Sequence, residues 1–231
     1  MESVKGMTLI ICALKAEAKP FIKAIKKSKT TRNGKLKTYH GTIDNFEVVI
    51  ACCGVGLETA AASTQTLIDN YEITRIIMSG TAGGIGKKID IGHTIVSTEL
   101  LYHDNSNDEV FIADSGLLES FKNAVKKNPP VHKVHFGRIS SGGKFITGDT
   151  FASIAKKYNP LCVDMETAAV AEVCNKNNIP FIAVRSVTDT REKSGMFTFF
   201  RYMSSSAKNS FIVVKKLLSE LKETHKGCTP E

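Results

Sequence analysis

The 231-residue chain has no tryptophan, only 7% aromatic residues and no long uninterrupted apolar run. The missing apolar run argues against a bilayer-spanning helix, which needs about 20 consecutive apolar residues. The formal charge of +8 is scattered along the chain, and few aromatic side chains interleave the lysines as they do in nucleic-acid-binding surfaces. We therefore expect a solvated basic surface, with no membrane partner and no nucleic-acid partner.

Cysteine pairs of the Cys-x-x-Cys type are also missing. Five of the six cysteines lie in apolar runs and the sixth follows near the end of the chain: Cys12, Cys52, Cys53, Cys162, Cys174 and Cys228. This usage indicates reduced core residues. The first residues lack the signal-peptide order of charge, apolar stretch and cleavage site. We expect a cytoplasmic protein.

A metal site is not expected either. The two histidines of "VHKVHF", His132 and His135, have an odd spacing that places them on opposite faces of a strand. We therefore do not expect this pair to bind a metal ion.

What the chain does contain is an alternation of apolar, β-branched runs with helical patterns. Strands are predicted near 7–13, 36–43, 46–53, 74–80, 92–101, 133–141, 160–163 and 180–187, and helices over 16–28, 56–70, 115–127, 164–177 and 202–223. The stretch "IDNFEV" (43–48) is predicted to be a hairpin turn. With 42% hydrophobic residues and no linker, residues 1–231 are predicted to form one α/β domain. Its central sheet should be mixed and mostly parallel, with helices on both faces.

Two glycine-rich stretches approach known nucleotide motifs without matching them. "CCGVGLET" (52–59) has Thr59 in place of the third glycine of GxGxxG, and no acid follows about twenty residues later. "GTAGGIGKK" (80–88) fails GxxxxGK[ST] at Thr81 and Lys88. A nicotinamide site and a P-loop are therefore not expected, although both stretches permit a close approach of backbone to a small ligand.

Three acids stand at the ends of three different apolar strands. Glu17 follows the first strand, Glu166 follows "LCV" (161–163), and Asp189 ends "FIAVRSV" (181–187). Acids at helix starts commonly act as N-terminal caps, and capping accounts for Asp164 as readily as a functional role does. Because ligand sites of α/β sheets lie at the carboxyl ends of strands, the three acids together predict one functional constellation.

Seven stretches in register resemble the purine nucleosidase branch of the nucleoside phosphorylase family, from about residue 7 to residue 221. They are "ALKAEA", "GVG", "SGTAGGIG", "YHD", "GRISSGGKFI", "VDMETAAVAEVC" and "VRSVTD". The chain looks most like the nucleosidases of 5′-methylthioadenosine and S-adenosylhomocysteine. This resemblance implies a twisted central sheet, a homodimer, and hydrolysis of the N-glycosidic bond of adenine nucleosides without a cofactor.

The resemblance also implies a role for each matching residue. Glu17 would be the general base on water, and Asp189, supported by Thr188, would protonate purine N7. Glu166 would accept hydrogen bonds from the ribose diol, with Met165 against the sugar. The remaining substrate-binding residues would be the base-contacting Phe145, Ile146 and Phe199, and Ala13, Val55 and Thr81 beside the sugar and its 5′ side.

Two alternatives and two departures accompany this interpretation. A phosphorylase on the same fold would carry an arginine facing phosphate, and "CALKAEAKP" (12–20) has none. A nucleoside-binding module would have no need of Glu17 as a base.

The segment between "YHD" and "GRISSGG" is short, which leaves the preferred 5′ substituent open. Gly143 stands where the family often has an aspartate, and another stretch of similar composition, "TGDTF", follows at 147–151.

Overall fold

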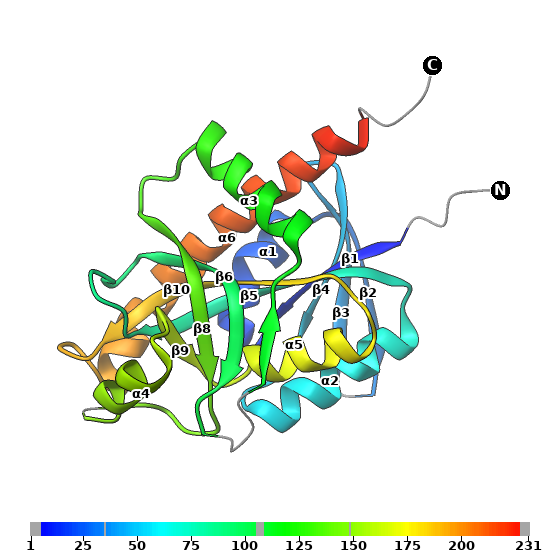
Figure 1. Ribbon diagram of the computed structural model, residues 1–231. Helices are drawn as coiled ribbons and strands as arrows, with labels where there is room; N and C mark the ends of the chain where they lie inside the picture. Colours follow the sequence, from blue (N-terminus) through cyan, green and yellow to red (C-terminus); the bar gives the residue numbers. More distant parts are fainter. Residues whose placement is uncertain (1–5, 35, 105–108, 148, 227–231) are drawn as a thin grey trace.

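The computed structural model describes residues 6–34, 36–104, 109–147 and 149–226. Figure 1 shows its strands and helices. The strands are β1 (Met7–Cys12), β2 (Lys26–Asn33), β3 (Leu36–Ile43), β4 (Phe46–Cys52), β5 (Ile73–Gly84), β6 (Thr94–Tyr102), β7 (Val110–Ile112), β8 (Val134–Ser141), β9 (Cys162–Asp164) and β10 (Phe181–Thr190). The helices are α1 (Lys15–Ala24), α2 (Leu57–Asn70), α3 (Ser115–Lys127), α4 (Thr150–Tyr158), α5 (Thr167–Lys176) and α6 (Met196–Lys226).

The described strands form one mixed sheet that closes partly on itself. The order is β10-β6-β8-β9-β5-β1-β4-β3-β2, with β7 beside β6, and β10 also pairs with β5. Five strands therefore form a closed ring, from which β1, β4, β3 and β2 extend as an open sheet. The predicted α/β class with a mixed sheet is confirmed, and the ring adds a feature that the alternation of elements did not indicate.

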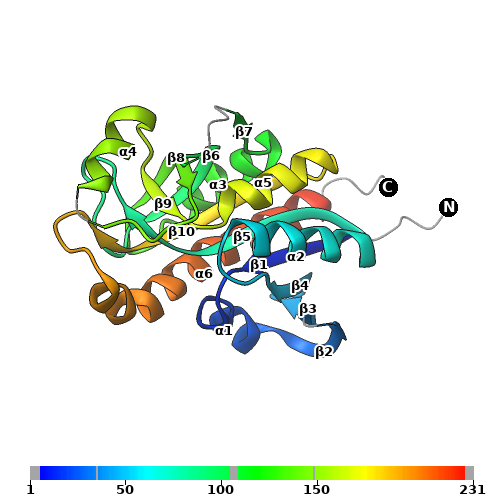
Figure 2. The ribbon, with the colours of Figure 1, turned by 90° about the horizontal axis from the view of Figure 1, so that it is seen from below.

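Helices cover the sheet on both faces. In Figures 1 and 2, α1, α3 and α6 lie on one face, and α2 and α5 lie on the other. Strands β5 and β10 are buried nearly throughout, which explains why each contains an uninterrupted apolar stretch, "IIM" (76–78) in β5 and "FIAV" (181–184) in β10, rather than an alternating pattern. No helix in the described part of the chain is both long and apolar enough to cross a membrane.

The hairpin predicted at "IDNFEV" is confirmed. β3 and β4 are antiparallel and joined at Ile43 and Phe46. The two connecting residues, Asp44 and Asn45, have φ values of 50° and 63°. Aspartate and asparagine tolerate this left-handed conformation better than other non-glycine residues, so the local sequence selects the tight turn.

Two predicted helices need correction, and three elements were missed. The helix expected over 16–28 ends at Ala24, and Lys26–Asn33 forms the edge strand β2. The final helix begins at Met196 rather than at residue 202. Helix α4 and the three-residue strand β7 were not predicted. The five cysteines within the described residues are free, and Cys228 lies outside the described residues.

A candidate active site at the ends of three strands

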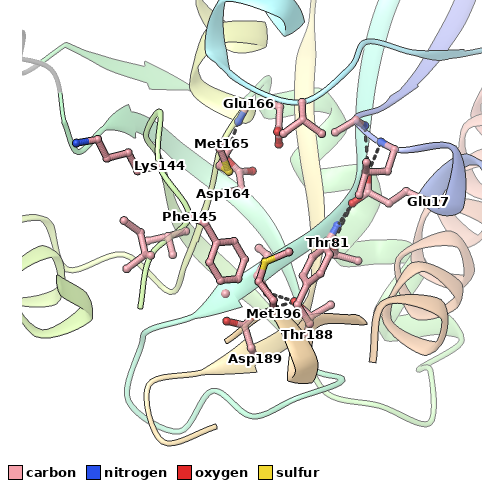
Figure 3. Close-up of a pocket in the computed structure, with 18 of the residues that line it drawn as sticks. Glu17, Thr81, Lys144, Phe145, Asp164, Met165, Glu166, Thr188, Asp189 and Met196 are labelled. Carbon is pink, nitrogen blue, oxygen red and sulfur yellow. Dashed lines mark hydrogen bonds between the residues drawn. The ribbon is translucent and has the colours of Figure 1, made fainter. Parts of the chain in front are cut away.

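All eleven predicted site residues line one cavity of about 340 Å³. Its walls come from the segments that follow β1, β4, β8 and β9, from the ends of β5 and β10, from α4, and from the first turns of α6. Figure 3 shows Glu166 and Glu17 on one side of this cavity, Asp189 and Thr188 on the other, and Phe145 between them. The strand-end constellation expected from the sequence is therefore assembled in space, while the chemical role of each residue stays a prediction.

Glu17 is held by four hydrogen bonds. Its Oε2 accepts from the backbone N–H groups of Ala13 (3.1 Å) and Leu14 (2.9 Å). Its Oε1 accepts from Thr81, from the backbone N–H at 2.7 Å and from the hydroxyl at 2.8 Å. The bond to Leu14 is a helix-capping interaction, because Leu14 is the N-cap residue of α1. The bonds to Thr81 reach across to β5, so capping alone does not describe this carboxylate.

Glu166 does not cap the helix that it precedes. It occupies the N-cap position of α5 without a side-chain capping bond. Its Oε1 instead accepts from the backbone N–H of Gly56 at 3.0 Å, in the loop before α2. Gly56 has φ 97°, a conformation that glycine adopts without strain. Burial, assisted by the charges of Asp164 and Glu17, raises the pKa of Glu166 to about 7, although Arg185 and Gly56 act against this rise.

Asp164 performs the capping instead. Its Oδ1 accepts from the backbone N–H groups of Glu166 (3.3 Å) and Thr167 (3.1 Å) and from the hydroxyl of Ser141 (2.5 Å). The same carboxylate forms an ion pair through Oδ2 with Nε of Arg185 at 2.7 Å. Asp164 therefore both caps α5 and neutralises the buried side chain of Arg185.

Arg185 is the residue of this site that the sequence analysis did not single out. Arg185 is fully buried in the middle of β10, and its Nη2 lies 3.6 Å from Oε2 of Glu166. Gly80 leaves room for Arg185 and Glu17, because a Cβ added at Gly80 would lie 2.2 Å from Nη1 of Arg185 and 2.7 Å from Oε1 of Glu17. Burial acts to lower the pKa of Arg185, but Asp164, Glu166 and Glu17 together raise it. A usable signal was present, because an arginine inside the apolar run "FIAVRSV" must be paired with acids when buried.

Asp189 lies near the end of β10 and is not the N-cap residue that its position suggested. Its Oδ1 accepts from the hydroxyl of Thr188 at 2.7 Å. Burial raises the pKa of Asp189, and the Thr188 hydrogen bond opposes this rise. A carboxyl with a raised pKa in a cavity is suited to carry a proton that it can transfer.

Aromatic and apolar side chains form the rest of the cavity wall. The rings of Phe145 and Phe199 meet edge to face with centroids 5.9 Å apart, and Phe199 meets Phe200 at 5.3 Å. Met196, also in α6, is 51% exposed at the cavity. This wall offers aromatic rings and apolar side chains of the kind that bind a heterocyclic base.

The described residues contain no group of three or more potential ligands that could hold a metal ion. His135 is hydrogen-bonded to His93, with 3.1 Å between Nε2 and Nδ1, and His132 precedes β8 rather than lying on it. The pair considered in "VHKVHF" therefore does not converge.

Comparison with known proteins identifies the family of this chain. The family model of the phosphorylase superfamily matches residues 8–219. The chain belongs to the phosphorylase superfamily. Among superfamily members, the 5′-methylthioadenosine/S-adenosylhomocysteine nucleosidase of Bacillus cytotoxicus is 31% identical over 79% of this chain and 85% of its own length.

Solved structures of superfamily members match almost the whole chain. The nucleosidase of the same name from Colwellia psychrerythraea, in complex with adenine, is 27% identical with a TM-score of 0.87, covering 94% of this chain and 96% of that chain. The one from Neisseria meningitidis, in complex with methylthio-immucillin-A, is 26% identical with a TM-score of 0.86, covering 92% and 98%. The predicted family and the predicted nucleoside phosphorylase-like fold are therefore confirmed.

Proposed function

We propose that the protein is a nucleosidase that hydrolyses the N-glycosidic bond of adenine nucleosides such as 5′-methylthioadenosine and S-adenosylhomocysteine. The observation that carries the proposal is the meeting of Glu17, Glu166 and Asp189 in one cavity beside the aromatic wall. The relatives named above, one of them in complex with adenine, support the same reaction.

In the proposed mechanism, one carboxyl group donates a proton to the leaving base and another carboxylate removes a proton from the attacking water. Breaking the bond between C1′ and the purine places positive charge on the sugar and negative charge on the base. Asp189 gives its proton to purine N7, and Glu17 takes a proton from the water that adds to C1′. Each step of this kind contributes about 10²–10⁴-fold to the rate. Glu166 holds the ribose diol, and Phe145 and Phe199 enclose the base with Ile146 at its edge.

Phosphate is a poor fit as the attacking group. Glu17, Asp164 and Glu166 lie around Arg185, which already forms ion pairs with Asp164 and Glu166. Lys144 is a second cation at the cavity wall. A phosphate dianion beside Glu17 would meet its negative charge in a buried environment, where repulsion is strong. The sequence argument that no cation compensates holds only for the loop after β1, since β10 supplies Arg185. That cation is offset by more than one carboxylate, and hydrolysis remains favoured.

The products distinguish hydrolysis from phosphorolysis. We expect adenine and a free sugar, either ribose or its 5-thio derivative, at a rate that does not depend on phosphate concentration. Mass spectrometry of products formed in phosphate buffer and in phosphate-free buffer is the measurement. A sugar 1-phosphate as the main product would replace the nucleosidase by the phosphorylase alternative. Adenine binding without any turnover would support the binding-module alternative.

The assembly and the location are part of the same proposal. We propose a cytoplasmic homodimer without metal, cofactor or nucleic-acid partner. The exposed apolar side chains of Val110 (41%) and Ile112 (72%) on β7 support a protein partner at that edge, and the free cysteines suit a reducing compartment. Light scattering during size-exclusion chromatography measures the molar mass, and a monomer at micromolar concentration would contradict the dimer.

A further inference from the structure

The segment that follows β8 carries the aromatic wall of the cavity. β8 ends at Ser141, and Gly142, Gly143 and Lys144 lead to Phe145. The side chain of Phe145 is 37% exposed, and its one aromatic neighbour among the described residues is Phe199. A ring with so little surrounding packing depends on its own backbone for its position.

Two consecutive amides fix that backbone. The N–H of Gly142 donates to the carbonyl oxygen of Asp164 at 3.0 Å. The N–H of Gly143 donates to Oδ2 of Asp104 at 2.5 Å. Within the described residues, Gly143 is the last position before Phe145 whose backbone amide is hydrogen-bonded. The bond to Asp104 is therefore the anchor nearest to the ring.

Asp104 is itself placed by the residue before it. The backbone N–H of His103 donates to the carbonyl oxygen of Ser141 at 2.9 Å, and its Nδ1 lies 3.2 Å from the hydroxyl of Ser140. The imidazole packs so closely on Gly142 that a Cβ there would lie 2.2 Å from Nε2. The "YHD" stretch thus lies directly against the segment 140–143, and the carboxylate of Asp104 reaches the next amide.

We infer that Asp104 is a positioning residue that sets the place of Phe145, and thereby the affinity of the site for the purine base. The inference rests on the proposed function, because Phe145 contacts a base only if the cavity binds one. Asp104 does not line the cavity, so it acts through Gly143 and Phe145 rather than by touching the substrate. The contact is made by the backbone amide of Gly143, and an added Cβ there would lie 3.5 Å from Oδ2, an ordinary contact distance.

The test compares Asp104→Ala, Asp104→Asn and Phe145→Ala, alone and combined, with Asp69→Ala as the matched control. Asp69 is an exposed aspartate on α2 that also accepts one hydrogen bond, from Gln65. Calorimetry measures the dissociation constant of free adenine, and steady-state kinetics measures KM and kcat for methylthioadenosine. The melting temperature of each variant reports folding.

For Asp104→Ala we expect adenine affinity to fall and KM to rise by about 5–10-fold, the effect of losing one charge-assisted hydrogen bond at an exposed site, with kcat changed less. Asp104→Asn should restore part of the loss, because its amide oxygen still accepts from Gly143. In the Phe145→Ala background, Asp104→Ala should add little, since the residue through which it acts is gone.

Three results would overturn the inference: unchanged adenine affinity in Asp104→Ala, equal losses with and without Phe145, or an equal loss in Asp69→Ala. A wild-type protein that neither binds adenine nor releases it from nucleosides would instead overturn the proposed function. The two failures are distinguishable, because adenine binding by the wild-type protein is measured first.

Discussion

At the scale of single residues, the site separates two kinds of carboxyl group. Glu17 accepts four hydrogen bonds, which fix the position of its carboxylate at the cavity wall. Asp189 accepts one side-chain hydrogen bond and its burial raises its pKa, which suits an acid. Two carboxyl groups in contrasting environments are a common way in which one site supplies both a proton donor and a proton acceptor.

Replacing Asp189 by asparagine should remove the proton donor while keeping the shape of the side chain. We expect kcat to fall by about 10²–10⁴-fold, while the affinity for a non-hydrolysable substrate analogue changes only a few-fold, because proton transfer is needed only as the bond breaks. Single-turnover kinetics and calorimetry measure the two quantities. Turnover close to that of the wild-type protein would exclude Asp189 as the acid.

Replacing Glu166 by alanine should damage ribosides more than 2′,3′-dideoxyribosides. A carboxylate that accepts from two hydroxyl groups contributes roughly 100-fold in kcat/KM for ribosides, and it has no such partners when the diol is absent. Steady-state kinetics on the two substrate types measures the difference. Equal losses for both substrates would favour a structural role.

The pH dependence of the wild-type protein tests the same residue independently. With a pKa of about 7 in the empty site, Glu166 is ionised above this pH and protonated below it. The ionised form is the one that accepts both hydroxyl groups, so KM for ribosides should rise as pH falls below about 7. Because protonation of Asp189 affects both substrates alike, the ratio of riboside KM to dideoxyriboside KM isolates Glu166. A ratio that does not vary between about pH 5 and about pH 8 would contradict this assignment.

At the scale of elements, β5 and β10 lie side by side and place Gly80 opposite Arg185. Gly80→Ala would put a methyl group 2.2 Å from Nη1 of Arg185 and 2.7 Å from Oε1 of Glu17, so one of these groups must move. We expect a loss of about 1–3 kcal/mol in the free energy of unfolding and a loss of turnover of more than about tenfold. Denaturant titration and kcat measure the two effects. The control is Gly116→Ala on the exposed surface of α3, where an added Cβ would lie 3.3 Å from Oδ1 of Asp114, a much milder contact. Gly116→Ala should therefore cost less stability than Gly80→Ala, and an equally mild Gly80→Ala would show that the contact with Arg185 is not tight.

How far the sequence predicts an element depends on what holds that element in place. β5 and β10 were predicted because their own side chains form the core, whereas β2 has the sequence "KKSKTTRN" and is a strand only because it pairs with β3. Such an edge strand needs no apolar face, and its charges discourage further pairing. The strand-end acids were predicted because each directly follows a recognisable apolar strand. For Arg185, the sequence indicates only that a buried arginine needs acidic partners, and the three partners themselves come from distant parts of the chain. The closing pair of β10 with β5 and β6 is likewise a tertiary property that no local pattern carries.

At the scale of the whole molecule, the site is a property of the complete sheet. Glu17 follows β1 in the open part of the sheet, Glu166 follows β9 in the ring, and Asp189 lies on the strand that pairs with both β5 and β6. Helices on both faces hold these strands in place without contributing most of the cavity wall. Small changes in how the ring closes would therefore alter the distance between the proposed base and the proposed acid.

The pairing of β10 with both β5 and β6 also determines when the site residues come together during synthesis. β10 comprises residues 181–190, so the ring gains its last member only after these residues have left the ribosome. Until then β5 lacks one of its neighbours, Arg185 is not yet near Glu17, and Asp189 does not yet face Glu17 across the cavity. Contacts between residues so distant in sequence form slowly, because loop closure costs entropy before the contact stabilises anything. The nascent protein therefore acquires its complete set of site residues only after residue 190 has left the ribosome, and partly folded chains carry an incomplete set.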